Sequence, residues 1–330
     1  MKAWVVQEDL SLQQVELAEP QPGPGQVRVQ IQAAAVNKRD YWISVGKYPG
    51  IKPGVALGSD GAGVVDMLGE GVSQEWLHKS VVINPNINWG PDPAVQGDDY
   101  QILGMPAHGT FAEYVVVDED RLHLKPDFLS VEEAAALPLS GLTAFRACFY
   151  HGRINAEKNV LVTGFGGGVA HYAFMFARAT GASVSVTTGK VANLEKARQM
   201  GASHAFDYHQ SDWITQASMH CNGFDVIIDS AGGEQFNELI RLLKPAGRLV
   251  FYGATNGLPT KLDLYRLFWK QITIQGSTMG NDSEFAEMLA FVADKQIRPM
   301  IRRQYPFEQT DLAIKQLSET SAPGKVVVVM

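Results

Sequence analysis

The sequence contains only two cysteines, Cys148 and Cys221, in 330 residues. Two thiols are too few for a disulfide framework or a four-cysteine zinc lobe, and such sparse usage suits a reducing compartment. No apolar run reaches the length of a membrane span. The first ten residues, MKAWVVQEDL, carry acidic groups where a signal peptide would be apolar. These absences predict a cytoplasmic protein without a membrane partner.

A surplus of basic residues is also missing. The formal net charge is −7, with acidic and basic residues interspersed, which disfavours nucleic acid or an anionic membrane as the principal partner. With 45% hydrophobic residues, a chain of this length is able to bury two sizeable cores. The composition therefore predicts two domains and a small-molecule partner.

The first third of the chain has the pattern of a β-rich domain. Residues 27–33 alternate apolar and polar side chains, as a half-buried strand does. Further strands are expected at residues 61–67, 80–84 and 111–117. A long loop, NPNINWGPDPAVQGDDYQ, spans residues 84–101. Loops of this length inside a compact domain usually cover a site or an interface.

From residue 130 onward the pattern changes to alternating helices and strands. Ser130 and Glu133 have the spacing of a capping box that begins a helix, which Pro138 interrupts. Apolar strands that alternate with helices predict a parallel sheet covered on both faces. The expected strands are residues 160–163, 184–187, 225–229, 248–252 and 272–275, and the expected helices are residues 167–179, 191–200 and 234–243.

The end of the sequence returns to the first pattern, with a short helix expected near residues 308–318 and a strand in KVVVVM. We therefore expect a discontinuous first domain, residues 1–126 and 277–330. The second domain, residues 127–276, is expected to be doubly wound.

A glycine-rich stretch, LVTGFGGGVAHY, occupies residues 161–172 between an expected strand and an expected helix. In that context, missing side chains let a pyrophosphate approach the backbone, and the helix start favours its negative charge. The alternative is that the glycines only form a tight turn. The next strand ends in Thr187-Thr188-Gly189-Lys190, without the carboxylate that binds the ribose of NAD(H). Lys190 favours NADP(H) instead, unless it is simply a solvated lysine.

Several longer motifs carry a family resemblance: AAAVNKRDYWISVGKYPG, LGSDGAGVV, GTFAEYVVV, LPLSGLTAFRA, DSAGG, GRLVFYG and the terminal GKVVVV. With them, nearly the whole chain resembles the medium-chain dehydrogenase/reductase superfamily, and within it the zinc-independent quinone oxidoreductase and enoyl reductase branches. VVINPNINWG is also similar to the subgroup named zinc-type alcohol dehydrogenase-like. The resemblance implies an α/β fold, a GroES-like catalytic domain with a Rossmann domain, and a homodimer or homotetramer.

The residue types at the family's zinc positions predict that no metal binds. Where zinc-dependent relatives have a ligating cysteine, this chain has Asn37, and Gly58-Ser59-Asp60 stands in place of their glycine-histidine-glutamate. The third ligand region is Gly141-Leu142-Thr143 and offers no thiolate. Catalytic zinc needs thiolate, imidazole or carboxylate ligands. Cys148 follows nearby, but we expect it to be a buried helix residue.

Without a metal to polarise a carbonyl, an electron-poor acceptor is the expected substrate. Quinones and α,β-unsaturated carbonyl compounds are such acceptors, and the resemblance implies that a nicotinamide cofactor gives them a hydride. It also assigns catalytic positions to Asn37 and Tyr48, although Asn37 also suits a turn and Tyr48 a surface position. Asp60 is left out of this catalytic pair because it also suits the cap of a turn.

Three aromatic residues are open to two interpretations. Trp42, Trp89 and Tyr100 suit an aromatic acceptor pocket, but such residues more often belong to a core or an interface.

The expected cofactor-binding residues follow the ends of the predicted strands, where a parallel sheet presents ligands, or match the family. They are Thr143, Gly166, Gly167, Gly168, Val169, Thr188, Gly189, Lys190, Tyr208, Ser230, Ala231, Tyr252, Gly253, Ala254, Ser277 and Thr278. The sequence thus predicts an NADP(H)-dependent reductase. An enoyl-thioester reductase and a non-catalytic NADPH sensor or structural protein remain alternatives, because a fold does not fix a function.

Overall fold

A computed structural model describes residues 1–318 and 322–330, and the chain in it divides into two compact units. The first unit contains Met1–Ser140 with residues 281–318 and 324–330, and the second contains Gly141–Gly280 with residues 322–323. The units divide after Ser140 and after Gly280, where the sequence pattern placed the boundaries after residues 126 and 276. Helix α2 (Val131–Ala135) contacts strands of the first unit.

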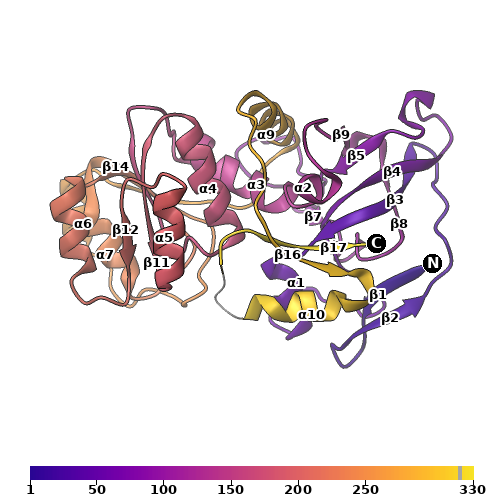
Figure 1. The fold of residues 1–330 in the computed structure, drawn as a ribbon, viewed down its shortest axis with the longest axis horizontal. Coiled ribbons are helices and arrows are strands. Elements are labelled where there is room, and N and C mark those ends of the chain that lie inside the picture. Colours follow the sequence, from indigo (N-terminus) through magenta and orange to yellow (C-terminus); the bar gives the residue numbers. More distant parts are fainter. Residues whose placement is uncertain (319–321) are drawn as a thin grey trace. The chain divides into compact units, whose positions relative to one another are not determined.

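The first unit is built on a seven-stranded sheet with the order β16-β17-β3-β4-β5-β9, in which β8 also pairs with β3 (Figure 1). The last strand of the chain pairs antiparallel with β3, which joins the two ends of the sequence in one sheet. The strands are β3 (Gln26–Ala35), β4 (Asp60–Leu68), β5 (Ser80–Ile83), β8 (Tyr114–Asp118), β9 (Leu122–Leu124), β16 (Ile301–Pro306) and β17 (Lys325–Val329). Smaller antiparallel pairs are β1 (Lys2–Val6) with β2 (Leu12–Glu16) and β6 (Asn86–Ile87) with β7 (Gln101–Ile102).

The strands expected at residues 27–33, 61–67 and 80–84 are confirmed. The strand expected at 111–117 begins only at Tyr114, although Ala112 forms an isolated bridge with Ala3. The apolar residues of β3 and β4 are buried in one core. That core fixes which side chains at the ends of these strands are turned inward.

Short helices complete the first unit: α1 (Lys38–Ser44), α2, α9 (Asp282–Asp294) and α10 (Thr310–Lys315). The capping box at α2 is confirmed, since Ser130 Oγ accepts from the Glu133 amide at 3.2 Å and Glu133 accepts from the Ser130 amide at 2.9 Å. Helix α3 (Pro138–Phe145) starts at Pro138, where a missing N–H costs no helical hydrogen bond. The helix expected at 308–318 consists of α10 and two flanking 3-10 turns.

The second unit is built on a six-stranded parallel sheet with the order β12-β11-β10-β13-β14-β15, the doubly wound order in which ligands bind at the strands' carboxyl ends. Its strands are β10 (Asn159–Val162), β11 (Ser183–Thr188), β12 (Ala205–Asp207), β13 (Phe224–Asp229), β14 (Leu243–Phe251) and β15 (Thr273–Gly276). Its helices are α4 (Gly168–Ala179), α5 (Val191–Gln199), α6 (Trp213–Cys221), α7 (Gln235–Leu242) and α8 (Leu264–Trp269), and a π-helical turn spans Arg146–His151.

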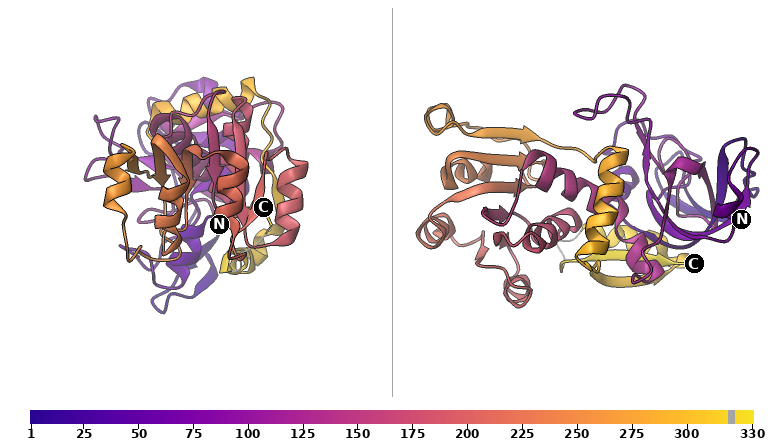
Figure 2. Two further views of the ribbon diagram at one scale, coloured as in Figure 1. Left: turned by 90° about the vertical axis from the view of Figure 1, so that its left-hand side faces the viewer. Right: turned by 90° about the horizontal axis from the view of Figure 1, so that it is seen from above.

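Helices lie on both faces of this sheet (Figure 2). On one face, α6 and α7 bury Trp213 and Leu239 in a cluster with Leu161 and Ile227. Helix α4 contacts β10 and β11. The predicted parallel sheet is therefore confirmed, but β12 and α6 were not predicted, because a three-residue strand carries too little periodicity. In the described part of the chain, no helix is both long and apolar enough for a membrane crossing.

Candidate functional site

The glycine loop joins β10 to α4 and exposes backbone. Gly164 has a φ of +68°, and Phe165 N donates to Thr187 O of the adjacent strand at 3.0 Å. Gly167 occupies the N-cap of α4 without a side-chain cap. The amides at the start of this 12-residue helix therefore favour a negatively charged ligand. The left-handed glycine, Gly164, was not among the expected cofactor-binding residues, whereas Gly166, Gly167, Gly168 and Val169 lie half-buried or exposed at this turn.

At the end of β11, a glycine makes room for two neighbouring rings. A Cβ atom at Gly189 would lie 2.5 Å from His209 Nε2 and 2.7 Å from Tyr208 Oη. Thr188 is buried and its Oγ1 accepts from Asn193 Nδ2 at 3.3 Å. Lys190 is exposed at the N-cap of α5. Tyr208, His209 and the Gly189 backbone thus meet beside an exposed lysine.

One carboxylate does lie near this position. Asp207 ends β12, and its Oδ1 accepts from the His209 amide at 2.9 Å. That carboxylate is therefore engaged in shaping the turn that carries Tyr208 and His209.

A buried carboxyl group ties the end of β13 to the end of β10. Asp229 is 1% exposed and accepts from Thr163 Oγ1 at 2.5 Å and from the Gly232 amide at 2.8 Å. Burial raises the pKa of Asp229. Burial also raises the pKa of Tyr252, whose side chain hydrogen-bonds Ser230. The expected residues Ser230 and Ala231 follow β13, and Tyr252, Gly253 and Ala254 follow β14.

The segment after β15 contains an unsatisfied hydroxyl group. Ser277 Oγ is buried and has no hydrogen-bond partner in the described ranges, although Ser277 N donates to Phe251 O at 2.9 Å. Thr278 is exposed, and Thr143 Oγ1 lies 3.7 Å from Met279 Sδ. A buried hydroxyl without a partner is costly unless a ligand satisfies it. The bared glycine loop and this hydroxyl, both at the carboxyl end of the sheet, fit a nicotinamide dinucleotide.

The first unit contains a buried group of four polar side chains, which we name the polar cluster: Asn37, Asp60, Ser140 and Lys325. Their exposed fractions are 3%, 0%, 3% and 4%, respectively. Lys325 Nζ lies 2.5 Å from Asn37 Oδ1, 3.0 Å from Asp60 Oδ2 and 3.2 Å from Ser140 Oγ. An ammonium group has three donors, and each finds an acceptor here. A buried charge of this kind is tolerated because it is paired and fully hydrogen-bonded.

Further hydrogen bonds fix the cluster to the backbone. Asn37 Nδ2 donates to Asp60 Oδ2 at 2.8 Å, and Leu139 N donates to Asp60 Oδ1 at 2.8 Å. Asn37 N donates to Asp40 Oδ2 at 2.8 Å. Asp40 is fully buried, and its Oδ1 has no hydrogen-bond partner within the described residues. Burial raises the pKa of Asp40 to about 6.

Sequence reasoning identified Asn37 but missed three members of the polar cluster. Asp60 was left out of the catalytic pair, yet it hydrogen-bonds Asn37 directly. Ser140 and Lys325 were not expected at all. The available signal was a lysine at the start of VVVV, because a charge that begins a buried strand needs a partner.

Tyr48 lies in a different set of contacts. It is half-buried, and its hydroxyl accepts from Arg39 Nε at 3.3 Å while the guanidinium lies 5.0 Å from the ring centre. Arg39 is 8% exposed and also donates to Ser59 Oγ at 2.5 Å and to Leu103 O at 2.9 Å. Adjacent residues of α1 therefore contact the two expected catalytic residues separately: Arg39 holds the Tyr48 side chain, and Asp40 accepts from the backbone amide of Asn37.

The aromatic residues of the long loop are structural. Trp89 is 3% exposed, its Nε1 donates to Asp92 O at 3.0 Å, and its ring meets Tyr100 edge to face at 5.2 Å. Tyr100 Oη donates to Asn86 Oδ1 at 2.7 Å, and burial raises the pKa of Tyr100. These contacts favour the core interpretation for Trp89 and Tyr100. Trp42 is half-buried beside Tyr41.

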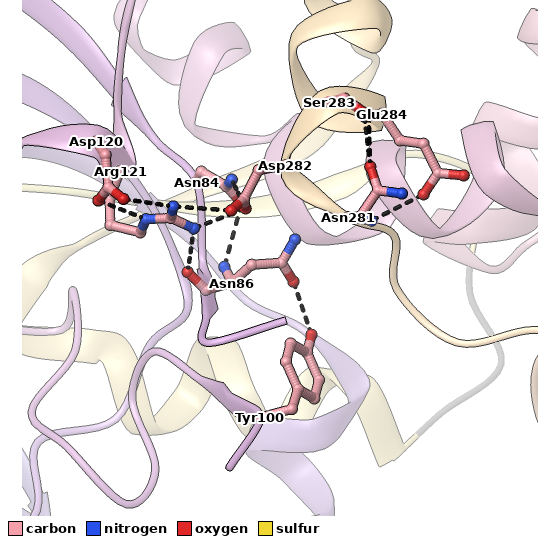
Figure 3. A network of polar contacts seen from close by, with 9 residues as sticks. All are labelled: Asn84, Asn86, Tyr100, Asp120, Arg121, Asn281, Asp282, Ser283 and Glu284. Carbon is pink, nitrogen blue, oxygen red and sulfur yellow. Dashed lines mark hydrogen bonds and ion pairs between the residues drawn. The ribbon is translucent and has the colours of Figure 1, made fainter. Parts of the chain in front are cut away.

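Charged side chains attach this loop to the start of α9 (Figure 3). Arg121 donates to both carboxylate oxygens of Asp282, at 2.6 and 2.8 Å, and to Asn86 O at 2.8 Å. Asn84 Nδ2 donates to Asp282 Oδ1 at 2.8 Å. A bidentate arginine–carboxylate pair has a defined geometry, so it sets the path of the loop at residues 84–86.

The residues at the expected zinc positions do not fit zinc. Within the described residues, no group of three or more His, Cys, Asp or Glu side chains is placed to hold a metal ion. The polar cluster offers amide, hydroxyl and carboxylate oxygens without thiolate or imidazole, and Lys325 already satisfies them. Cys148 is fully buried, and burial raises the pKa of its thiol, as expected for a helix core residue.

Known proteins match both units. The alcohol dehydrogenase GroES-like domain family matches residues 23–127, and the zinc-binding dehydrogenase family matches residues 168–294. The zinc-type alcohol dehydrogenase-like protein YogA of Leptosphaeria maculans is 34% identical, over 94% of this chain and 90% of that protein. The quinone oxidoreductase of Mus musculus is 27% identical, over 96% and 93%. A crystal structure of an NAD-dependent alcohol dehydrogenase superposes with a TM-score of 0.94 at 34% identity and covers both chains completely.

Proposed function

This chain belongs to the medium-chain dehydrogenase/reductase superfamily, a family of oxidoreductases that use a nicotinamide cofactor, and we propose that it is an NADP(H)-dependent, zinc-independent reductase of quinones or α,β-unsaturated carbonyl compounds. Its GroES-like unit and its parallel Rossmann sheet are the two parts of the family fold. The observation that carries the proposal is the polar cluster. There two of the residues that stand in place of zinc ligands, Asn37 and Asp60, hydrogen-bond the ammonium of Lys325.

The choice of NADP(H) rests on the end of β11. Lys190 is exposed there, and the preceding residues, Thr188 and Gly189, provide no carboxylate to repel a 2′-phosphate. A nearby carboxylate, Asp207, accepts from the His209 amide. Tyr208, beside Gly189, offers a ring and a hydroxyl at the same position.

The expected chemistry needs little from the protein beyond orientation and a hydrogen-bond donor. The reduced cofactor supplies the hydride when it is bound. The glycine loop and the α4 amides hold its pyrophosphate, and Ser277 Oγ offers a hydrogen bond at the end of β15. Asn37 and Tyr48 are the proposed donors for the acceptor.

Two features of the second unit support the proposed homo-oligomer. In the described sheet, β15 pairs only with β14 and leaves one edge open. Helix α8 exposes large apolar side chains: Leu264 is 64% exposed, Tyr265 80%, Phe268 62% and Trp269 82%. An open edge and an exposed apolar surface both favour association with a second copy. Light scattering is expected to give a dimer or tetramer that Trp269→Glu weakens.

The cysteines agree with a reducing environment. Both are free thiols, which supports the proposed cytoplasmic location.

Cofactor titration of purified, metal-analysed protein tests the proposal. We expect NADPH to bind about tenfold or more tightly than NADH, since a charge-assisted phosphate contact is lost with NADH. Lys190→Ala is expected to remove most of this preference, whereas the exposed lysine Lys261 serves as the control in Lys261→Ala. Equal binding of both cofactors by the wild type would contradict the NADP(H) assignment.

Turnover then identifies the acceptor. Oxidation of NADPH with a quinone or an enone, without stoichiometric zinc, supports the proposed reductase. Turnover only with an enoyl-CoA would favour the thioester reductase. Tight NADPH binding without turnover on any acceptor would favour a sensor.

A further inference from the structure

The orientation of the Asn37 side chain is fixed without ambiguity. An ammonium group only donates and an ionised carboxylate only accepts. The atom 2.5 Å from Lys325 Nζ is therefore the amide oxygen, and the atom 2.8 Å from Asp60 Oδ2 is the amide nitrogen. A flipped amide would place two donors together at Lys325 Nζ and two acceptors together at Asp60 Oδ2.

This arrangement leaves one hydrogen of the Asn37 amide free. Oδ1 accepts two hydrogen bonds, from Lys325 and from Ser140 at 3.2 Å. Nδ2 has two hydrogens, and its hydrogen bond in the described structure goes to Asp60. The second Nδ2–H has no acceptor among the described residues.

The buried charge makes that free N–H a stronger donor. A cation on the carbonyl oxygen draws electron density from the amide nitrogen, and hydrogen bonds in series reinforce one another in a medium of low dielectric constant. Lys325 is 4% exposed and Asp60 is fully buried, so water screens this effect only weakly. Asp60 keeps the ammonium in place, and Leu139 N holds Asp60.

We propose that Lys325 is a positioning residue that orients and polarises Asn37, whose free Nδ2–H donates to the acceptor oxygen that gains negative charge in the reaction. This inference rests on the proposed function. The hydride and its two electrons pass from NADPH to a carbon of the quinone or enone, the carbonyl π electrons move to oxygen, and water supplies the proton that completes the product. The Asn37 N–H stabilises the oxygen before that proton arrives.

Kinetics of three proteins test this role: wild type, Lys325→Met and the double variant Lys325→Met/Asp60→Asn. We expect Lys325→Met to lower kcat by roughly 10–100-fold, the scale of a lost or weakened oxyanion donor, with the Kd for NADPH within about twofold of wild type. The double variant removes both buried charges and should recover most of the thermal stability while kcat stays low. Lys244→Met breaks a partly exposed Lys–Asp pair of 2.9 Å in the second unit and is the control for loss of a lysine outside the polar cluster.

Recovery of kcat together with stability in the double variant would show a purely structural role and overturn the inference. A second measurement does not depend on turnover. NMR resonances of the Asn37 side-chain amide are assigned by their loss in Asn37→Asp. In the wild type we expect them downfield of ordinary asparagine amides, and in the double variant we expect them at the ordinary position. If the wild type reduces no acceptor, the proposed function fails. The resonances then still test whether Lys325 polarises the Asn37 amide. Unshifted resonances in the wild type would overturn it.

Discussion

A buried histidine in the second unit should make its stability depend on pH. His171 lies on α4, is 1% exposed, and has no hydrogen-bond partner for either ring nitrogen within the described residues. Its neighbours include the rings of Phe165 and Tyr172, at 5.8 and 6.3 Å. Burial, together with the smaller effect of the Lys196 charge, lowers the pKa of His171 from 6.5 to about 4.

The sign and size of the effect follow from this difference. Between pH 6.5 and about 4 the unfolded chain binds a proton at His171 and the folded chain does not, so the free energy of unfolding decreases as the pH falls. At about 1.4 kcal/mol per pKa unit, the full difference corresponds to about 3 kcal/mol. Below about pH 4 both states are protonated and this contribution stays constant.

His171→Phe removes the titrating group and keeps an aromatic ring in the site. The difference in free energy of unfolding between His171→Phe and wild type should therefore grow in favour of the variant by about 3 kcal/mol from pH 7 to pH 4. Urea unfolding at a series of pH values, followed by circular dichroism, measures it. His151, whose pKa burial also lowers to about 4, is present in both proteins and cancels.

The same substitution at an exposed histidine, His220→Phe, is the control. A free-energy difference between His171→Phe and wild type that does not change with pH would refute the reasoning. An equal change in the control would show that the effect does not come from burial.

Three further outcomes are expected. Gly189→Val should weaken binding of both NADPH and NADH in fluorescence titrations, because its Cβ would lie 2.5 Å from His209 Nε2; unchanged affinities would contradict this packing. Lys325→Met should cost about 3–5 kcal/mol in urea unfolding, since it leaves Asp60 buried without its cation, and a cost below about 1 kcal/mol would mean that the pair is not buried. Ser130→Ala should lower the free energy of unfolding by about 1 kcal/mol through loss of the α2 cap. Equal melting temperatures of the variant and the wild type in thermal unfolding would contradict this.

Local patterns predicted the secondary structure where a strong local signal existed. The alternation in β3, the capping box at Ser130 and the glycine turn before α4 all depend on residues within a few positions of one another. Elements with weak periodicity were not predicted. Among them are β12, which has three residues, and α6, whose polar and apolar residues are mixed. The pairing of β17 with β3 also gave no local signal, because it joins residues about 290 positions apart in sequence.

The cofactor-binding residues and the polar cluster also differ in how far the sequence could predict their positions. In the parallel sheet, the carboxyl ends of all strands lie at the same end of the sheet. Locating the strands was therefore enough to place Gly166, Lys190 and Ser230 at that end. The sequence by itself therefore determined the doubly wound sheet, the glycine turn before α4 and the absence of thiolate and imidazole at Asn37, Asp60 and their neighbours. Only the tertiary structure decided that Lys325 lies against Asn37 and Asp60, because hydrogen bonds between buried side chains from distant segments depend on how the sheet brings those segments together.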